Sequence, residues 1–168
     1  MTVLETKRLV IRKLTDADAE FIVDLLNQPS FLRYIGDKGV RNTDDAVRYI
    51  QAGPIASYDR FGFGQYLVEL KETSVPIGMC GLLKRDTLPD VDVGFAFLPQ
   101  YWTQGYAFEA ADAVMVYGRE VLGLRRIVAI TSLDNTASIR LLEKMGLKFE
   151  GLLKLPEQGE VRLFGPGS

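Results

Sequence analysis

The stretch LPQYWTQGYAFEA, residues 98–110, joins a predicted strand to a predicted long helix, and Gly105 stands where the helix begins. The first N–H groups of a helix lack intrahelical partners and lie at the positive end of its dipole, so they can bind an anion. Gly105 has no Cβ to keep a phosphate away from the backbone, and Ala107 is small for the same reason. The segment predicts a phosphate-binding loop, although an ordinary strand–turn–helix connection would fit it equally well.

The strand that leads into this loop has two different faces. Apolar residues alternate with small or polar ones over residues 91–97, which is the period of a strand. Asp92, Gly94 and Ala96 share one face, and their small side chains leave room for a ligand beside the carboxylate. Pro99 should end the strand.

Periodicity and turn signals predict the other elements. Strands are expected at residues 8–12, 63–70, 77–83, 126–131, 149–153 and 161–164. Helices are expected to begin at Thr15, Asn42, Gly105 and Asn135, Pro29 should end the first or begin a short second one, and Gly53-Pro54 should stop or bend the helix that begins at Asn42. This order predicts an α/β (α+β) fold around one central sheet, as a single domain over residues 1–168.

The segment from Asn135 to Gly146 is a predicted helix with a polar start. Asn135 is a good N-cap and Gly146 a good C-terminal cap. Ser138 lies three residues after Asn135, so the two share a helix face and could bond a ligand laid along the sheet edge. Capping alone is the simpler interpretation of Asn135.

Composition excludes several classes of protein. The chain has 168 residues, a net charge of -2 and no run of Lys or Arg, which argues against a nucleic-acid binder. It has no histidine and one cysteine, so a Ser-His-Asp triad, a Cys-His pair and a His-ligated metal are excluded, and we expect no metal site. The chain shows no signal peptide and no membrane-length apolar run, which predicts a cytoplasmic protein without a membrane partner.

Taken together, three motifs in order resemble the GCN5-related N-acetyltransferase (GNAT) superfamily, and more closely its ribosomal-protein-acetylating (RimJ/RimL-type) branch. The opening residues 4–12 look like that branch's first strand, residues 101–107 like its pyrophosphate loop, and residues 135–151 like its second CoA-contacting segment. The resemblance implies a mixed, mostly antiparallel sheet with a splayed strand pair and helices on both faces. It also implies transfer of an acetyl group from acetyl-CoA to a primary amine, including a protein N-terminal amine.

The resemblance assigns the cofactor contacts. The strand that carries Phe95 and Phe97 would splay from the strand that carries Val128 and Ile130, and the pantetheine arm would lie in the gap. Asn135 and Ser138 would contact the arm near its thiol. The pyrophosphate would bind to backbone N–H groups around Gln104, Gly105, Tyr106, Ala107 and Phe108.

Three positions depart from the family pattern. Trp102 stands where the loop often begins with Arg or Gln, and Thr103 stands at a frequent glycine. Leu142 replaces a Tyr that often protonates the leaving thiolate, so Ser138, a nearby Tyr or water must serve, or the thiolate leaves unaided. With no histidine, the best base is a carboxylate acting through water, and we choose Asp92, where this branch often carries an acid.

Alternatives to these assignments remain open. Asp92 would otherwise be a solvated strand residue, Asp90 and Glu109 are the other nearby carboxylates, and Cys80 is better explained as a packed thiol than as a nucleophile. The acceptor could instead be a polyamine, an antibiotic or an amino acid, or the protein could bind CoA without turnover. The acceptor mouth could be lined by Tyr34, Tyr49, Phe61 and Phe63, which could also fill the core. The chain could act as a monomer or a homodimer.

Overall fold

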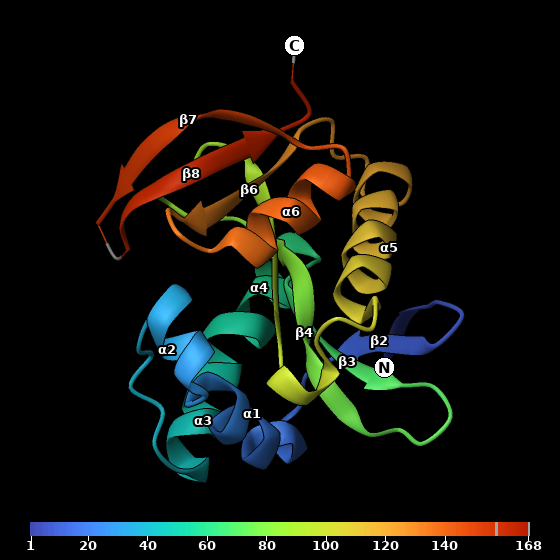
Figure 1. Cartoon of the computed structure of the whole chain (residues 1–168). Coiled ribbons are helices and arrows are strands. Elements are labelled where there is room, and N and C mark those ends of the chain that lie inside the picture. The colour runs from blue at the N-terminus through green and yellow to red at the C-terminus, as the bar shows by residue number, and fades with distance from the viewer. Residues whose placement is uncertain (157, 168) are drawn as a thin grey trace.

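The strands of the computed structural model, which describes residues 1–156 and 158–167, form one eight-stranded sheet in the order β1-β2-β3-β4-β5-β6-β8-β7 (Figure 1). Only the β5–β6 pair is parallel, so the expected mixed, mostly antiparallel sheet is confirmed. The strands are β1 (Thr2–Glu5), β2 (Leu9–Lys13), β3 (Gln65–Leu70), β4 (Pro76–Leu83), β5 (Val91–Phe97), β6 (Ile127–Ser132), β7 (Lys148–Leu155) and β8 (Gly159–Gly165).

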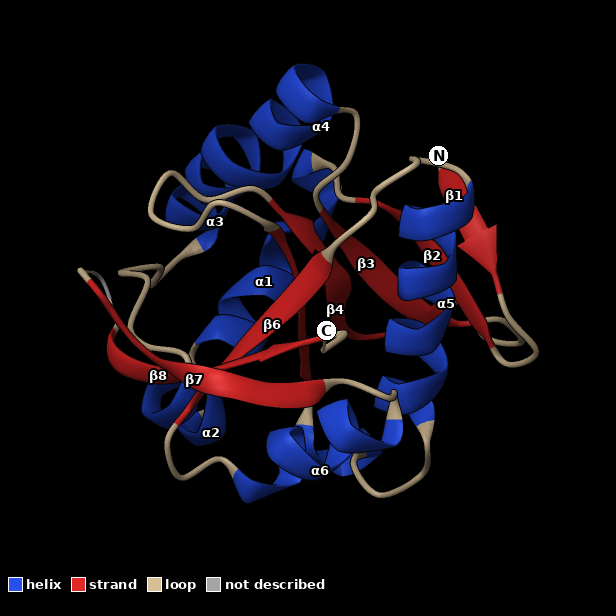
Figure 2. Ribbon diagram, turned by 90° about the horizontal axis from the view of Figure 1, so that it is seen from above, coloured by secondary structure: helices blue, strands red, loops and turns tan. Residues whose placement is uncertain are grey.

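Helices cover both faces of the sheet, as the two views in Figures 1 and 2 show. On one face, α5 packs on β4 and β5 and α6 lies beside β6. On the other face, α1, α2 and α3 form a second apolar cluster against Leu67 of β3 and Met79 of β4. The helices are α1 (Ala19–Leu26), α2 (Pro29–Tyr34), α3 (Thr43–Ile50), α4 (Ala56–Phe61), α5 (Tyr106–Glu120) and α6 (Thr136–Lys144).

The N-terminal third differs from the prediction in two places. Residues 4–12 form a hairpin of β1 and β2 rather than one strand, because Thr6 makes the turn: its N–H donates to the Leu9 carbonyl at 2.9 Å. Gly53-Pro54 does not stop the helix that begins at Asn42. The backbone passes through a π-helical segment, Gln51–Ile55, whose wider turn accommodates Pro54 and leads directly into α4.

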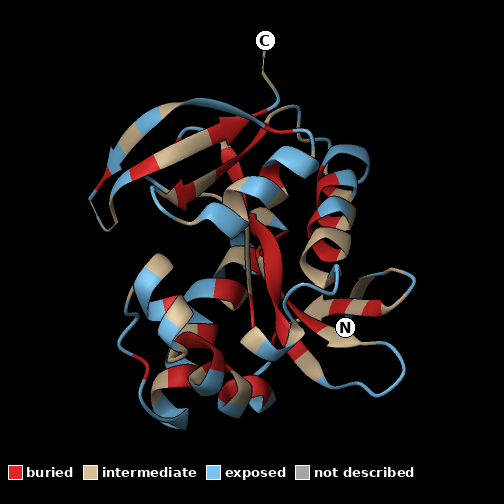
Figure 3. Cartoon of the chain, in the orientation of Figure 1, coloured by how far each residue is buried: buried red, intermediate tan, exposed pale blue. Residues whose placement is uncertain are grey.

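The core follows the central strands, where buried residues gather in Figure 3, while the outward faces of α6 and β7 are exposed. Alternation along β5 places Val91, Val93 and Phe97 in the cluster under α5. The opposite face of β5 carries Ala96, which packs against the α1–α3 cluster. Within the described residues, no helix is long and apolar enough to cross a membrane.

The two parallel strands separate soon after they meet. β5 and β6 pair only at Val91–Ile127 and Asp92–Val128. Beyond Asp92 the edges of β5 and β6 diverge, so the sheet is split at its centre. The expected splayed pair is confirmed, and Val128 is the last residue of β6 to pair with β5.

Candidate active site

The loop of residues 102–108, called the phosphate loop below, has the geometry that an anion site requires. Gly105 is the N-cap of α5 and has a left-handed φ of 84°, which a residue without a Cβ adopts freely. The α5 helix runs for fifteen residues from Tyr106, so its dipole points its positive end at this loop. The predicted backbone donors at Gln104, Gly105, Tyr106, Ala107 and Phe108 are thus brought together at the start of one helix.

Arg8, which the sequence did not suggest as a site residue, binds this loop through its side chain. Arg8 donates from Nη1 to the Gln104 carbonyl at 3.0 Å and from Nε to Glu109 at 2.7 Å, and its guanidinium lies 4.3 Å from the Tyr106 ring centroid. Thr6 and the Arg8 N–H also donate to Glu109. These contacts join residues about a hundred positions apart, so no local pattern predicts them. The one hint in the sequence is that Thr6 and Arg8 lie in the opening segment that resembles the family.

Glu109 therefore does more than complement the helix dipole. Although burial raises the pKa of its carboxyl, the hydrogen bonds from Thr6 and Arg8 outweigh burial and leave that pKa below its ordinary value. Glu109 stays ionised and ties the β1–β2 turn to the first turn of α5. This role removes it from the candidates for the catalytic base.

The two unusual loop residues have structural consequences. Trp102 donates its indole N–H to the Phe97 carbonyl at 2.9 Å, which fastens the loop to the end of β5. Thr103 has a φ of 62°, a conformation unfavourable for a β-branched residue. A glycine at this position would adopt the same backbone without strain.

The second predicted segment lies across the splay from β5. Asn135 is the N-cap of α6 and its Oδ1 accepts the Ser138 N–H at 3.3 Å. Both residues line the same pocket as the diverging strands. Asn135 therefore caps the helix, as the simpler interpretation predicts, and the contact of Asn135 and Ser138 with a pantetheine arm stays a prediction.

This pocket has a volume of about 160 Å³ and passes through the split in the sheet. One wall comes from the α1–α3 side, through Phe31, Tyr34, Ile35 and Tyr49. The other comes from β6 and α6. The small face of β5, predicted to leave room for a ligand, forms its floor at Gly94 and Ala96.

Asp92 lies in this pocket but is not a solvated residue. It is 1% exposed, and Arg85 donates to both of its oxygens, from Nε at 2.9 Å and from Nη2 at 3.3 Å. Burial raises the pKa of the Asp92 carboxyl above its ordinary value, against the charge of Arg85, which lowers it. Sequence reasoning missed Arg85, which lies in the loop after β4 and faces Asp92 only once β4 and β5 pair.

The other predicted residues divide between the pocket and the core. Tyr34 and Tyr49 line the pocket, whereas Phe61 and Phe63 stack on each other with centroids 5.8 Å apart. Asp90 is held by Arg126 at 3.0 Å, outside the pocket. Cys80 is fully buried and burial raises the pKa of its thiol, as a packed thiol requires.

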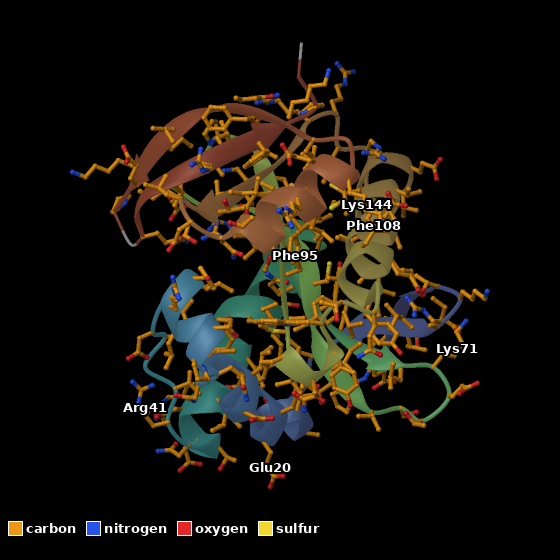
Figure 4. The ribbon with its side chains drawn as sticks, in the orientation of Figure 1. Glu20, Arg41, Lys71, Phe95, Phe108 and Lys144 are labelled. Atoms are coloured by element: carbon orange, nitrogen blue, oxygen red, sulfur yellow. The ribbon has the colours of Figure 1, made fainter. Side chains whose placement is uncertain are left out.

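Leu142 and Phe97 are also packing residues. Leu142 is fully buried, although it touches the pocket from α6. The Phe97 ring lies over Gly78, where a Cβ would come within 2.6 Å of it, and 6% of the residue is exposed. On the outer side, Lys144 lies 4.4 Å from the Phe108 ring centroid, and Figure 4 shows the two between α6 and α5.

Comparison with known proteins agrees with this geometry. The acetyltransferase (GNAT) domain family model matches residues 8–148. The sequence is 34% identical over 153 residues to the uncharacterized N-acetyltransferase YoaA of Bacillus subtilis (strain 168), covering 90% of this chain and 86% of that relative. The chain therefore belongs to the GNAT family of acetyltransferases.

Solved structures share the whole fold. The GNAT-family acetyltransferase from Bacillus anthracis superposes with a TM-score of 0.81 at 28% identity, covering 98% of this chain and 97% of that one. The ribosomal L7/L12 alpha-N-protein acetyltransferase RimL, in complex with coenzyme A, superposes with a TM-score of 0.83 at 16% identity, over 98% and 97%. The protein is an acetyl-CoA-dependent N-acetyltransferase.

The residues present fit acetyl-CoA, which brings the acetyl group as a thioester. The phosphate loop offers backbone N–H groups at a helix N-terminus, and Gly105 lets Arg8 pack close against the loop, since an added Cβ would lie 3.2 Å from Arg8 Nη2. The diverging edges of β5 and β6 can pair with an extended amide-bearing arm. The pocket would then receive the reactive end of the donor from the α5–α6 side.

Proposed function

We propose that this N-acetyltransferase acts on the N-terminal amine of a protein. The carrying observation is the pocket's electrostatics: Asp92, the one carboxylate among its described lining residues, is paired with Arg85. A wall without net negative charge favours an acceptor with one amine over a polyamine, which requires several carboxylates. The likeness of fold to RimL, which acetylates a protein α-amine, agrees with this acceptor.

The chemistry suits an α-amine as well. A protein N-terminus has a pKa of about 7.7–8.0 and a lysine side chain about 10.4, so an α-amine loses its proton far more easily at neutral pH. A chain without histidine has little general-base power, which makes the more acidic ammonium the better acceptor. We place the reaction in the cytoplasm.

Each residue then has a stated task. The phosphate loop and the β5 edge hold the donor, and a β5 N–H polarises the thioester carbonyl. The amine nitrogen bonds to the acetyl carbon, the carbon–sulfur bond breaks, and the amine proton passes through water to Asp92. Each Asp92 oxygen accepts one hydrogen bond from Arg85 and retains a lone pair for that water. Ser138 donates a proton to the departing sulfur and regains one from water.

A panel of amines incubated with acetyl-CoA and read by mass spectrometry tests the acceptor. The panel contains a lysine-free peptide with a free N-terminus, Nα-blocked lysine, a polyamine and free amino acids. We expect acetylation of the peptide at neutral pH and at least about tenfold lower kcat/KM for the others. Faster transfer to the polyamine would overturn the α-amine assignment, and CoA binding without transfer to any amine would mark a binding module.

A further inference from the structure

A row of three residues crosses the sheet toward the active site. Gln65 of β3 is the register partner of Gly81 of β4, and Gly81 is the register partner of Gly94 of β5. Directly opposed residues share a sheet face, and this face is the one that carries Asp92. We call Gln65, Gly81 and Gly94 the glycine row.

The two glycines leave a path for the Gln65 side chain. A Cβ on Gly81 would lie 2.2 Å from the Gly64 carbonyl oxygen and 2.7 Å from Gln65 Cα, so no side chain can stand there. A Cβ on Gly94 would lie 2.8 Å from Gln65 Nε2. The carboxamide therefore reaches across β4 and lies over Gly94, at the start of the splay.

The end of this side chain is polar, buried and unpartnered. Gln65 Oε1 is shielded from solvent and accepts no hydrogen bond from the described part of the chain. Ser132 Oγ, at the end of β6, is the other buried side-chain atom in this condition within residues 1–156 and 158–167, and both residues line the active-site pocket. A buried acceptor without a donor costs free energy unless a ligand or water supplies one.

The acceptor amine can supply an N–H donor to this oxygen, because the amide N–H groups of the donor's arm would pair with the strand edges. A neutral primary amine keeps its lone pair for attack and directs its two N–H groups elsewhere, and these gain positive charge as the new bond forms. A neutral carboxamide oxygen can accept one of these N–H groups. A second carboxylate would favour the unreactive ammonium, whereas a neutral oxygen does not. Asp92, on the same strand face, is placed to take the proton from the other side.

We propose that Gln65 Oε1 binds the acceptor amine and orients its nitrogen toward the acetyl group. This inference rests on the proposed function of the site. It explains why two adjacent strands carry glycine in one row and why the polar end of Gln65 lies over Gly94 in the pocket.

The test measures steady-state acetylation of a lysine-free peptide with a free N-terminus. Gln65→Met keeps the length of the side chain and fills the glycine row but removes the oxygen. We expect kcat/KM for the peptide to fall about tenfold or more while the dissociation constant of CoA stays within about twofold of wild type. Gln51→Met, a surface substitution of the same kind on α3's C-terminal side, should change neither.

Gln65→Glu separates amine binding from a structural role. A carboxylate beside the amine favours the ammonium, so the pH at which the rate reaches half its plateau should rise by about one unit or more. Unchanged peptide kinetics in folded Gln65→Met, or an unshifted pH profile in Gln65→Glu, would overturn the assignment of Gln65 alone. A wild-type enzyme that acetylates no member of the amine panel would instead overturn the proposed function, and this inference with it.

Discussion

The two halves of the active site are built in different ways. In the site that we propose, the donor half consists mainly of main-chain groups from continuous segments: the phosphate loop, the open edge of β5 and the start of α6. The acceptor half consists of side chains from β3, β5, α2 and α3 and from the loop after β4, which meet only in the folded sheet. A backbone site tolerates many side chains, whereas a side-chain site depends on each member, so the acceptor half is where selectivity can change.

The same difference explains which features could be predicted from the sequence. The donor loop can be predicted locally, because a strand, a glycine and a helix follow one another in the sequence. Asn135, a typical N-cap residue, predicts the start of α6. The Arg8–Glu109 tie, the Arg85–Asp92 pair and the glycine row join residues through sheet register, which no local pattern encodes. Asp92 was placed on the correct face by alternation, but its burial depends on helices α1–α3 covering that face.

The largest effect should come from breaking the acceptor half at Asp92. Asp92→Asn keeps an oxygen for Arg85 but cannot accept a proton, and general-base help is worth about 10²–10⁴ in rate. We expect kcat to fall within this range at neutral pH, and the loss to shrink toward about pH 9 as more of the amine is already neutral. A pH–rate profile of the purified variant, with its melting temperature, measures this.

Asp90→Asn is the matched control, because Asp90 lies two residues earlier on the chain and binds Arg126 outside the pocket. Its pH–rate profile should follow the wild type. If the Asp92→Asn profile also runs parallel to wild type from about pH 6 to about pH 9, Asp92 is not the base.

A change in the donor half should weaken CoA binding without the pH-dependent loss of rate expected for Asp92→Asn. Gly105→Ala strains the left-handed backbone at a φ of 84° and brings a Cβ within 3.2 Å of Arg8 Nη2, which should shift the N–H groups of the loop. We therefore expect CoA affinity to fall about tenfold, or about 1.4 kcal/mol. Gly123→Ala carries the same left-handed backbone penalty, with a φ of 72°, at the far end of α5. Calorimetry should show weaker CoA binding for Gly105→Ala only, and equal losses for both would indicate general helix damage.

Leu142 tests where the two halves meet. Since Leu142 is fully buried, Leu142→Tyr and Leu142→Phe should both overpack the core and lower the free energy of unfolding by about 1–3 kcal/mol. The two rings are similar in size, so a higher kcat for the Tyr variant than for the Phe variant would show that a phenolic hydroxyl helps by protonating the leaving thiolate. Denaturant unfolding and kcat measured on both variants give the comparison, and equal kcat values would show that the thiolate needs no added acid.

The smallest effect concerns backbone strain in the phosphate loop. Thr103→Gly should raise the free energy of unfolding by about 1 kcal/mol, because it removes the left-handed penalty at a φ of 62°. Ser74→Gly, at a φ of 59° in the β3–β4 turn, should give a similar gain far from the site. Thermal denaturation checks both variants. A loss of stability in Thr103→Gly would mean that the Thr103 side chain stabilises the loop by more than its strain costs.

Hydrogen–deuterium exchange with and without CoA tests most directly whether the donor occupies the backbone half of the site. Binding at the phosphate loop and along the open edge of β5 should slow exchange of amides in residues 104–108 and 93–96, while amides of α1 and α3 exchange as before. Protection confined to α1–α3, or none in residues 104–108 at saturating CoA, would contradict the assignment of the donor to the α5–α6 side of the split sheet.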